Sequence, residues 1–332
     1  MADMPGEFDL ITRLFEPLTA GEPGAFNLSD DAAVITPPPG KDIVVTSDTI
    51  VAGVHFLRTD PPQSVAVKLL AVNLSDLAAM GATPHAYTLA AAWPRDISAD
   101  WLAAFAAGLG AAQSAAYVNL VGGDTVATPG PMTLNITAFG LVPPGMAVLR
   151  SGAAPGDHLF VSGTIGDAAL GLKVLDEDMP APISDEDRAV LTGRYREPTA
   201  RLNLGQAISG VASAAIDISD GLIADLRHLA DASNVHVTIN ADNIPLSDAS
   251  RRAVELTPDL YGLIYNGGDD YELAFTIPAG HVAEFRTIAA TIGTNVSEIG
   301  RVFESRGKGD NVSLVDGDGA DMKVPKEGYQ HF

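Results

Sequence analysis

Hydrophobic and polar positions alternate along this chain with two periods, one typical of strands and one typical of helices. Segments rich in β-branched residues and bounded by turn signals predict strands at residues 42–51, 117–121, 132–142, 158–161, 214–218, 235–239 and 271–277. Stretches rich in alanine and leucine predict helices at residues 65–80, 101–112 and 222–232, and another that begins in GTIGDAALG. This mixture predicts an α/β (α+β) protein.

A change of pattern near the middle of the chain predicts a domain boundary. Pro143, Pro144 and Gly145 end the strand predicted before them, and a new pattern starts at residues 150–156. We place the boundary near residue 148, with an N-terminal domain over residues 1–148 and a C-terminal domain over residues 149–332. Within the second domain, the acidic stretch at residues 176–187 predicts a solvated loop.

The acidic composition excludes one class of partner. The chain has 332 residues, and its 42 Asp and Glu against 20 Lys and Arg give a formal net charge of −22. The negative electrostatic potential of such a chain would repel the phosphate backbone of a nucleic acid, so no nucleic-acid partner is expected. The sequence contains no cysteine, which excludes disulfides, thiolate metal sites and a cysteine nucleophile and is compatible with a reducing cytoplasm.

No segment predicts insertion into a membrane. The longest apolar run, residues 101–112, is shorter than the roughly 20 residues that a membrane span needs, and it predicts a buried helix instead. The first residues, MADMPGEFDL, have no basic segment before an apolar one, so no secretory signal is expected. We therefore expect a cytoplasmic protein without a membrane partner.

The candidate chemistry lies in aspartates placed where predicted strands or helices end. The common phosphate-loop, zinc-protease and dinucleotide motifs are absent from the sequence. The aspartates so placed are Asp30, Asp31, Asp48, Asp76, Asp124, Asp217, Asp220, Asp269 and Asp270. Taken singly, each fits an N-cap, a turn or a structural ion pair. On the first predicted strand, the period of two puts Thr46 and Asp48 on one face and Ser47 on the other.

Together, these acids need positive charge from outside the chain. Burying a carboxylate without a partner costs several kcal/mol, and the chain has more than two acids for each Lys or Arg. Carboxylate and hydroxyl oxygens, without thiolates or paired histidines, suit hard divalent cations, above all Mg²⁺. Because Mg²⁺ usually bridges carboxylates to substrate phosphates, the pattern predicts nucleotide chemistry.

Three other features each have two interpretations, and a fourth, Lys68, has one. His55 fits a packed core histidine or a catalytic group, and Arg150 fits a surface cation or a phosphate clamp. Lys68 precedes Asp76 by two helical turns and fits a simple neutralising role. The glycines of GTIGDAALG suit a phosphate at a helix N-terminus, but a tight turn from strand to helix needs the same residues.

Seven motifs, in this order, resemble those of one family. They are DDAAV, TSDTIVAGVHF, KLLAVNLSDLAAMGATP, GGDT, PGDHLFVSGTIGDAALG, DISDGLIADL and GGDDYEL. From about Asp30 to the terminal GYQHF, the chain resembles the thiamine-monophosphate kinase family of the aminoimidazole ribonucleotide synthetase-like superfamily. The resemblance implies two α/β domains, with strands of the N-terminal domain contributing to a homodimer interface. It also implies transfer of the γ-phosphate of ATP to thiamine monophosphate, the last step of thiamine diphosphate biosynthesis, with several Mg²⁺ ions.

The resemblance further implies roles for individual residues. The metal-site residues would be Asp30, Thr46, Ser47, Asp48, Asp76, Asp124, Asp217 and Asp220. The ATP contacts would be Gly123, Asp124, Arg150 and Ser219, and the thiamine phosphate contacts would be His55, Asp269 and Tyr329. Two positions depart from the family pattern, because Ser29 stands where glycine is usual and Asp269 where glutamate is usual. The second departure bears on the fine geometry of the substrate pocket more than on the reaction class.

Physical chemistry then narrows the expected mechanism. The acceptor phosphate has a second pKa of about 6, so it is ionised near neutral pH and no general base is expected. Positioning and charge neutralisation have to bring two anions together. We assign metal positioning to Asp48, Asp76, Asp124, Asp217 and Asp220. The rival hypotheses are a superfamily member with another substrate, a nucleotide- or metal-binding module without turnover, and an acidic protein whose aspartates serve solubility alone.

Overall fold

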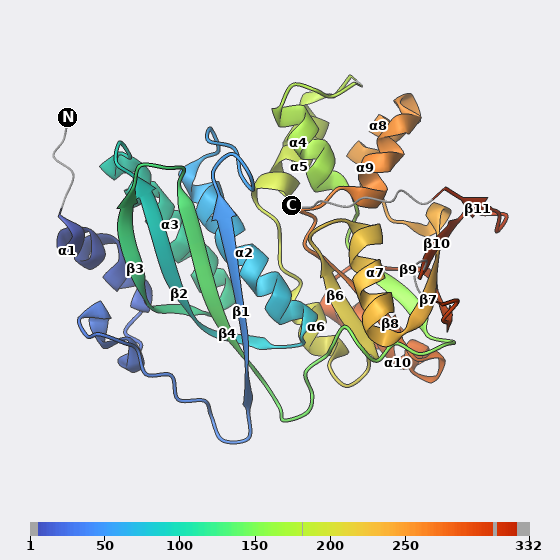
Figure 1. Cartoon of the computed structure of the whole chain (residues 1–332), viewed down its shortest axis with the longest axis horizontal. Helices are drawn as coiled ribbons and strands as arrows, with labels where there is room; N and C mark the ends of the chain where they lie inside the picture. Colours follow the sequence, from blue (N-terminus) through green and yellow to red (C-terminus); the bar gives the residue numbers. More distant parts are fainter. Residues whose placement is uncertain (1–5, 181, 308–310, 324–332) are drawn as a thin grey trace. The chain divides into compact units, whose positions relative to one another are not determined.

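The computed structural model describes residues 6–180, 182–307 and 311–323. The chain divides into two compact units, which are described separately below. Unit 1 comprises Met1–Leu77 and Ala82–Gly145, and unit 2 comprises Ala78–Gly81 and Met146–Phe332. Both units combine a β-sheet with helices, which confirms the α/β class predicted from the sequence pattern (Figure 1).

Unit 1 is a sheet covered by helices on one face (Figure 1). Its elements are α1 (Glu7–Leu10), β1 (Asp42–Val51), α2 (Pro62–Ala79), β2 (Thr83–Pro94), α3 (Ala99–Ala116), β3 (Asn119–Thr128) and β4 (Thr133–Val142). Among the described residues, the sheet has four strands in the order β1-β4-β2-β3, and only the β2–β3 pair is parallel. Leu69 of α2, Phe105 of α3 and Ile136 of β4 are fully buried in its core.

The strand pattern succeeds at β1 but is wrong at β3. β1 has the predicted bounds, whereas β3 starts two residues later than predicted and runs on through Gly122 and Gly123. A glycine pair normally signals a turn. Here a Cβ on Gly123 would lie 1.9 Å from the carbonyl oxygen of Leu89 on β2, so the glycine permits close strand pairing instead of ending the strand.

β2 does not follow from the sequence pattern. Gly81 and Pro84 predict a break after α2, yet the strand includes Pro84. The pairing of β2 with β4 shifts register between Pro84 and Ala86, and such an irregularity accommodates a residue that has no N–H to donate.

The apolar run at residues 101–112 lies in α3, as predicted. The hydroxyl of Ser98 caps this helix by accepting a hydrogen bond from the N–H of Trp101 at 3.1 Å. Within the described ranges, no helix is long and apolar enough to cross a membrane.

Unit 2 is a larger sheet with helices on both faces (Figure 1). Its strands are β5 (His158–Ser162), β6 (Ala214–Ile218), β7 (Val235–Asn240), β8 (Glu272–Ile277), β9 (Val296–Glu304), β10 (Val312–Val315) and β11 (Asp321–Met322). Its helices are α4 (Asp167–Leu175), α5 (Asp185–Arg196), α6 (Leu202–Ile208), α7 (Leu222–Ser233), α8 (Asp248–Leu256), α9 (Tyr261–Asn266) and α10 (Val282–Ile292). Over the described residues the strand order is β11-β10-β7-β9-β5-β8-β6. Phe160, Phe275 and Phe285 fill the core on one face.

The acidic stretch predicted as a loop is partly helical. α5 begins at Asp185, inside the predicted loop at residues 176–187. The hydroxyl of Ser184 accepts a hydrogen bond from the N–H of Asp187 at 3.1 Å and caps the helix. The three acids of the first turn lie at the positive end of the helix dipole and stabilise it. The acidic residues that predict a solvated loop therefore also favour the start of a helix.

Candidate active site

A strand and a helix of unit 1 bring three of the predicted residues together. The hydroxyl of Thr46 on β1 donates a hydrogen bond to Oδ2 of Asp76 on α2 at 2.5 Å. Two positions along the strand, the backbone N–H of Asp48 donates to Oδ1 of Asn73 on α2 at 3.0 Å. Asn73 is fully buried and donates in turn to the carbonyl oxygen of Leu69 at 3.0 Å. The predicted separation of strand faces is confirmed, and the face shared by Thr46 and Asp48 is directed toward α2.

Ser47 lies on the other, exposed face of the sheet. Its Oγ is 3.0 Å from Oγ1 of Thr137, and the side-chain amide of Asn135 on β4 donates to it at 3.1 Å. The same amide donates to the carbonyl oxygen of Asp48 at 3.0 Å, which fixes the strand pairing at this point. Since β1 is an edge strand of the described sheet, groups on both of its faces can be reached from that edge.

Asp124 and Asp30 lie elsewhere in unit 1. Asp124 belongs to β3, at the opposite edge of the sheet, where it pairs with Ala90 and its Oδ1 accepts from the N–H of Thr125 at 2.9 Å. Asp30 is exposed and accepts from the N–H of Asp31 at 3.0 Å. In the described part of the chain, no group of three or more His, Cys, Asp and Glu side chains is arranged to hold a metal ion. The metal-binding roles therefore stay predictions.

His55 is fixed by the backbone of the turn after β1. Its Nδ1 accepts a hydrogen bond from the N–H of Val51 at 3.1 Å. An accepting Nδ1 carries no proton, so the proton of the neutral ring is on Nε2. The half-buried ring has a defined orientation and tautomer, which suits a substrate contact as well as a packed histidine. Tyr329, the other predicted contact with an aromatic ring, lies outside the described residues.

The loop after β6 in unit 2 is organised by a residue that the sequence analysis missed. The backbone N–H groups of Ser219, Asp220 and Gly221 all donate to Oδ2 of Asp225, at 3.0, 3.0 and 3.1 Å. Burial raises the pKa of Asp225 well above its usual range, and the charges of Asp217 and Asp220 raise it further. An acid four residues after a glycine turn, in the first turn of a helix, is the signal that could have identified Asp225.

Arg150 is exposed, and the structure fixes its backbone. The hydroxyl of Ser233 at the end of α7 donates to the carbonyl oxygen of Arg150 at 3.0 Å. The same oxygen atom of Ser233 accepts from the N–H groups of Gly152 and Ala153, each at 3.1 Å. The segment after Arg150 is thereby attached to α7, while the guanidinium remains accessible to solvent.

Asp270 connects the two glycine-rich segments of unit 2. It is fully buried, and its carboxylate accepts from the N–H groups of Gly166 at 2.7 Å and Ala168 at 3.3 Å. The N-terminus of α4 thus already binds a side-chain carboxyl group of this chain, which favours the structural interpretation of GTIGDAALG over a phosphate cradle. Burial raises the pKa of Asp270 to about 8, although the backbone donors and Arg194 act to lower it.

This raised pKa predicts a dependence of stability on pH. Between the ordinary carboxyl pKa of about 4 and about 8, the folded chain keeps a proton on Asp270 that the unfolded chain has lost, so stability falls as the pH rises. The fall reaches about 1.4 kcal/mol per pH unit and stops above about pH 8. Asp270→Asn removes this titration and is expected to make this part of the profile less steep, while the raised pKa of Asp225 keeps a slope of the same sign. Urea unfolding of both proteins between about pH 5 and 9 measures the difference, and identical profiles would contradict the prediction.

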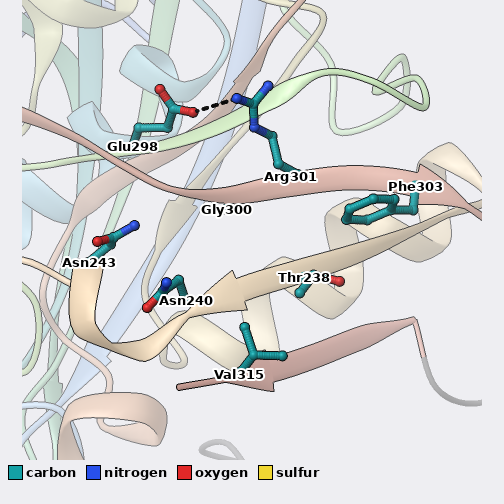
Figure 2. A pocket seen from close by; sticks show the side chains of 8 residues that line it. All are labelled: Thr238, Asn240, Asn243, Glu298, Gly300, Arg301, Phe303 and Val315. Atoms are coloured by element: carbon teal, nitrogen blue, oxygen red, sulfur yellow. Dashed lines mark ion pairs between the residues drawn. The ribbon is translucent and has the colours of Figure 1, made fainter. Parts of the chain in front are cut away.

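Unit 2 also has a cavity of about 440 Å³ over one face of the neighbouring strands β10, β7 and β9 (Figure 2). Thr238, Arg301, Phe303 and Val315 are among the residues that line it. Glu298 forms an ion pair with Arg301 at 3.3 Å beside the cavity. Within the part of the chain that the structure describes, no residue predicted for metal, ATP or thiamine phosphate lines this cavity.

Three known proteins are similar to this chain over most of its length. The thiamine-monophosphate kinase of Caulobacter vibrioides is 44% identical over 306 residues, which cover 91% of this chain and 86% of that protein. The crystal structure of thiamine-monophosphate kinase from Stenotrophomonas maltophilia K279a is 40% identical with a TM-score of 0.79, over 88% of this chain and 90% of that one. The structure of AaThiL complexed with AMPPCP and TMP is 31% identical with a TM-score of 0.77, over 100% of both chains.

Two family models also match the chain. The AIR synthase related protein, N-terminal domain, matches residues 29–142, and its C-terminal counterpart matches residues 154–312. With its two α/β units and acids at strand ends, the chain is thus of the AIR synthase related class. Within this class, the chain belongs to the thiamine-monophosphate kinase family.

Proposed function

We propose that this chain transfers the γ-phosphate of ATP to thiamine monophosphate and forms thiamine diphosphate and ADP, the last step of thiamine diphosphate biosynthesis. The observation that carries this proposal is the similarity, over the full length of both chains, to the complex of AaThiL with AMPPCP and TMP. AMPPCP is an ATP analogue, so that protein binds a nucleotide and a phosphorylated second ligand together. The curated relative with 44% identity supports the same activity.

The proposal assigns ligands to named positions of the two predicted domains. The N-terminal domain, residues 1–148, is the ATP- and Mg²⁺-binding domain, and residues 149–332 form the C-terminal domain. The ATP contacts are Gly123, Asp124, Arg150 and Ser219, and the thiamine phosphate contacts are His55, Asp269 and Tyr329. Support comes from the fixed ring of His55 and the exposed guanidinium of Arg150.

The chemistry of the donor groups fits Mg²⁺. The residues that would hold the ions are Asp30, Thr46, Ser47, Asp48, Asp76, Asp124, Asp217 and Asp220. All of them offer carboxylate or hydroxyl oxygens, the ligands that Mg²⁺ prefers. Burial raises the pKa of Asp225, and the charges of nearby Asp217 and Asp220 add to this effect, so acids gather at the end of β6 where a cation would relieve their repulsion. When bound, Mg²⁺ supplies charge neutralisation to the phosphoryl oxygens.

The chain's own task in this reaction is to position two anions. An oxygen of thiamine monophosphate forms a bond to the γ-phosphorus while the bond from that phosphorus to the departing oxygen of ADP breaks. Since the acceptor phosphate has a second pKa of about 6, it is ionised near neutral pH and no side chain has to remove a proton. His55 and Asp269 orient the acceptor, and Arg150 orients the nucleotide, so that the reacting atoms lie in line.

A single-turnover assay tests the function and its metal requirement. With purified protein, Mg²⁺, thiamine monophosphate and γ-labelled ATP, the label is expected in thiamine diphosphate. Excess chelator is expected to abolish the transfer, because the acidic site repels metal-free ATP. A reaction without acceptor controls for ATP hydrolysis. Full transfer in excess chelator would refute the metal requirement. ATP consumption that does not depend on thiamine monophosphate would refute the assignment of thiamine monophosphate as the acceptor.

The proposal extends to a homodimer in the cytoplasm. On the open face of the sheet in unit 1, Ile43, Val45 and Val126 are 40%, 56% and 50% exposed, which supports burial of this face by a second copy of the chain. The absence of cysteine from the sequence is compatible with a reducing compartment.

A further inference from the structure

The loop that carries Asp269 has a strained backbone. Asp269 has a φ of 69° and Tyr271 a φ of 51°, so two residues with side chains adopt the left-handed conformation on either side of Asp270. This conformation costs free energy in residues other than glycine, and it persists only where surrounding contacts impose it. Such strain is common at binding sites, and the contacts that impose it here therefore bear on the site.

The backbone of this loop is attached to the end of β6. The N–H of Asp269 donates to the carbonyl oxygen of Ser219 at 2.9 Å, and the N–H of Tyr271 donates to that of Ile218 at 2.8 Å. A Cβ on Gly268 would lie 2.2 Å from the carbonyl oxygen of Ser219, so the approach of the two segments requires glycine at this position. These contacts hold the N–H groups of the strained residues, but they leave the carbonyl group between them to another partner.

Arg194 of α5 is that partner. Its Nη2 donates to the carbonyl oxygen of Asp270 at 3.1 Å, between the two left-handed residues. The same nitrogen donates to Oε1 of Glu272 at 2.8 Å. Arg194 thus connects the strained loop to a carboxylate on the first residue of β8.

The carboxylate of Glu272 is itself rigidly held. Glu272 is fully buried, and Arg201 binds it through Nε at 2.6 Å and also through Nη2. The hydroxyl of Ser162 on β5 donates to its Oε2 at 2.5 Å. Because three side chains bind this buried carboxylate, its position is fixed. Arg194 binds both this carboxylate and the loop, so it holds the loop at a fixed place relative to Glu272.

We propose that Arg194 is a positioning residue, which holds the loop of residues 267–271 in the strained conformation that presents Asp269 to thiamine monophosphate. This inference rests on the proposed function for the identity of the ligand. Arg201 provides an internal comparison, since it binds the same carboxylate but, in the described part of the chain, forms no hydrogen bond with the loop. The loop contact, and not the charge beside Glu272, distinguishes the two arginines.

The test compares Arg194→Lys with Arg201→Lys. Both variants keep a positive charge near Glu272, so folding is expected to persist, but a lysine ammonium does not reproduce the planar arrangement of the guanidinium. Arg194→Lys is expected to raise the KM for thiamine monophosphate about tenfold and to change the KM for ATP less than about twofold. Arg201→Lys is expected to leave the ratio of these two KM values unchanged.

Amide hydrogen exchange measures the loop without reference to catalysis. Peptides that contain residues 267–271 are expected to exchange about tenfold faster in Arg194→Lys, and at the wild-type rate in Arg201→Lys. Equal protection of this loop in all three proteins would overturn the positioning role. Faster exchange without a change in the KM for thiamine monophosphate would overturn the link to substrate. A wild-type chain that does not phosphorylate thiamine monophosphate would refute the proposed function instead, and the exchange result would then decide the positioning role alone.

Discussion

Asp76→Asn is expected to lower the turnover of ATP with thiamine monophosphate by at least about 100-fold. Asp76 is the only acid in the sequence of α2, and its Oδ2 accepts the hydrogen bond of Thr46. Asparagine keeps an acceptor for this bond but removes the charge that attracts Mg²⁺. The structure at the contact of β1 and α2 should therefore persist while metal binding fails. Single-turnover transfer of the γ-phosphate, measured as a function of Mg²⁺ concentration, gives the size of the effect.

Two controls separate this loss from a general change in charge or fold. Asp100→Asn removes an exposed acid from the first turn of α3, in the same unit, and is expected to change turnover less than about twofold. Circular dichroism of Asp76→Asn should match the wild type. If the folded variant retained turnover within about tenfold of the wild type, Asp76 would not belong to the metal site.

Local pattern determines much of the fold of this chain. β6 has the predicted bounds because five consecutive buried residues stand between turn signals. β2 and β3 are less predictable from local sequence, since proline and glycine are interpreted as breaks. In β3, the fit of Gly123 against Leu89 is a property of the neighbouring strand, and no single segment shows it.

The sequence predicts individual residues of the candidate site, but it does not predict which residues they contact. Alternation along β1 assigns Thr46 and Asp48 to one face, because the face on which a strand residue lies depends only on its position along the strand. Asp270, by contrast, binds an N–H group 104 positions away, and nothing in either segment specifies that pairing. The departure at Asp269 also gains a physical reason from the structure. Aspartate enters the left-handed region more readily than glutamate, which suits the φ of 69° found at this position.

Glu272→Gln is expected to destabilise unit 2 by about 3 to 5 kcal/mol. Glu272 is fully buried, and its charge is matched by Arg194 and Arg201, whose side chains are only 17% and 22% exposed. Glutamine fills the same volume but leaves both guanidinium groups without a counter-charge in a region that excludes most water. Breaking one side of a buried ion pair costs far more than the pair contributes, since the remaining charge keeps its desolvation penalty.

The measurement has to report on unit 2 rather than on the whole chain. Both tryptophans, Trp93 and Trp101, lie in unit 1, so their fluorescence follows the unfolding of that unit. Amide exchange of peptides from β8 under native conditions follows unit 2 and gives the local free energy of opening.

A charge-neutral replacement and an exposed arginine provide the comparisons. Combining Glu272→Gln with Arg194→Gln and Arg201→Gln removes all three charges and is expected to recover part of the loss, because no charge remains unmatched. Arg286→Gln removes an arginine that is 61% exposed from its ion pair with Glu298, which keeps Arg301 as a partner at 3.3 Å, and it should cost less than about 1 kcal/mol. If Glu272→Gln lost no more than Arg286→Gln, the cluster around Glu272 would not be a significant source of stability. Arg194 would then have no fixed point from which to hold the loop.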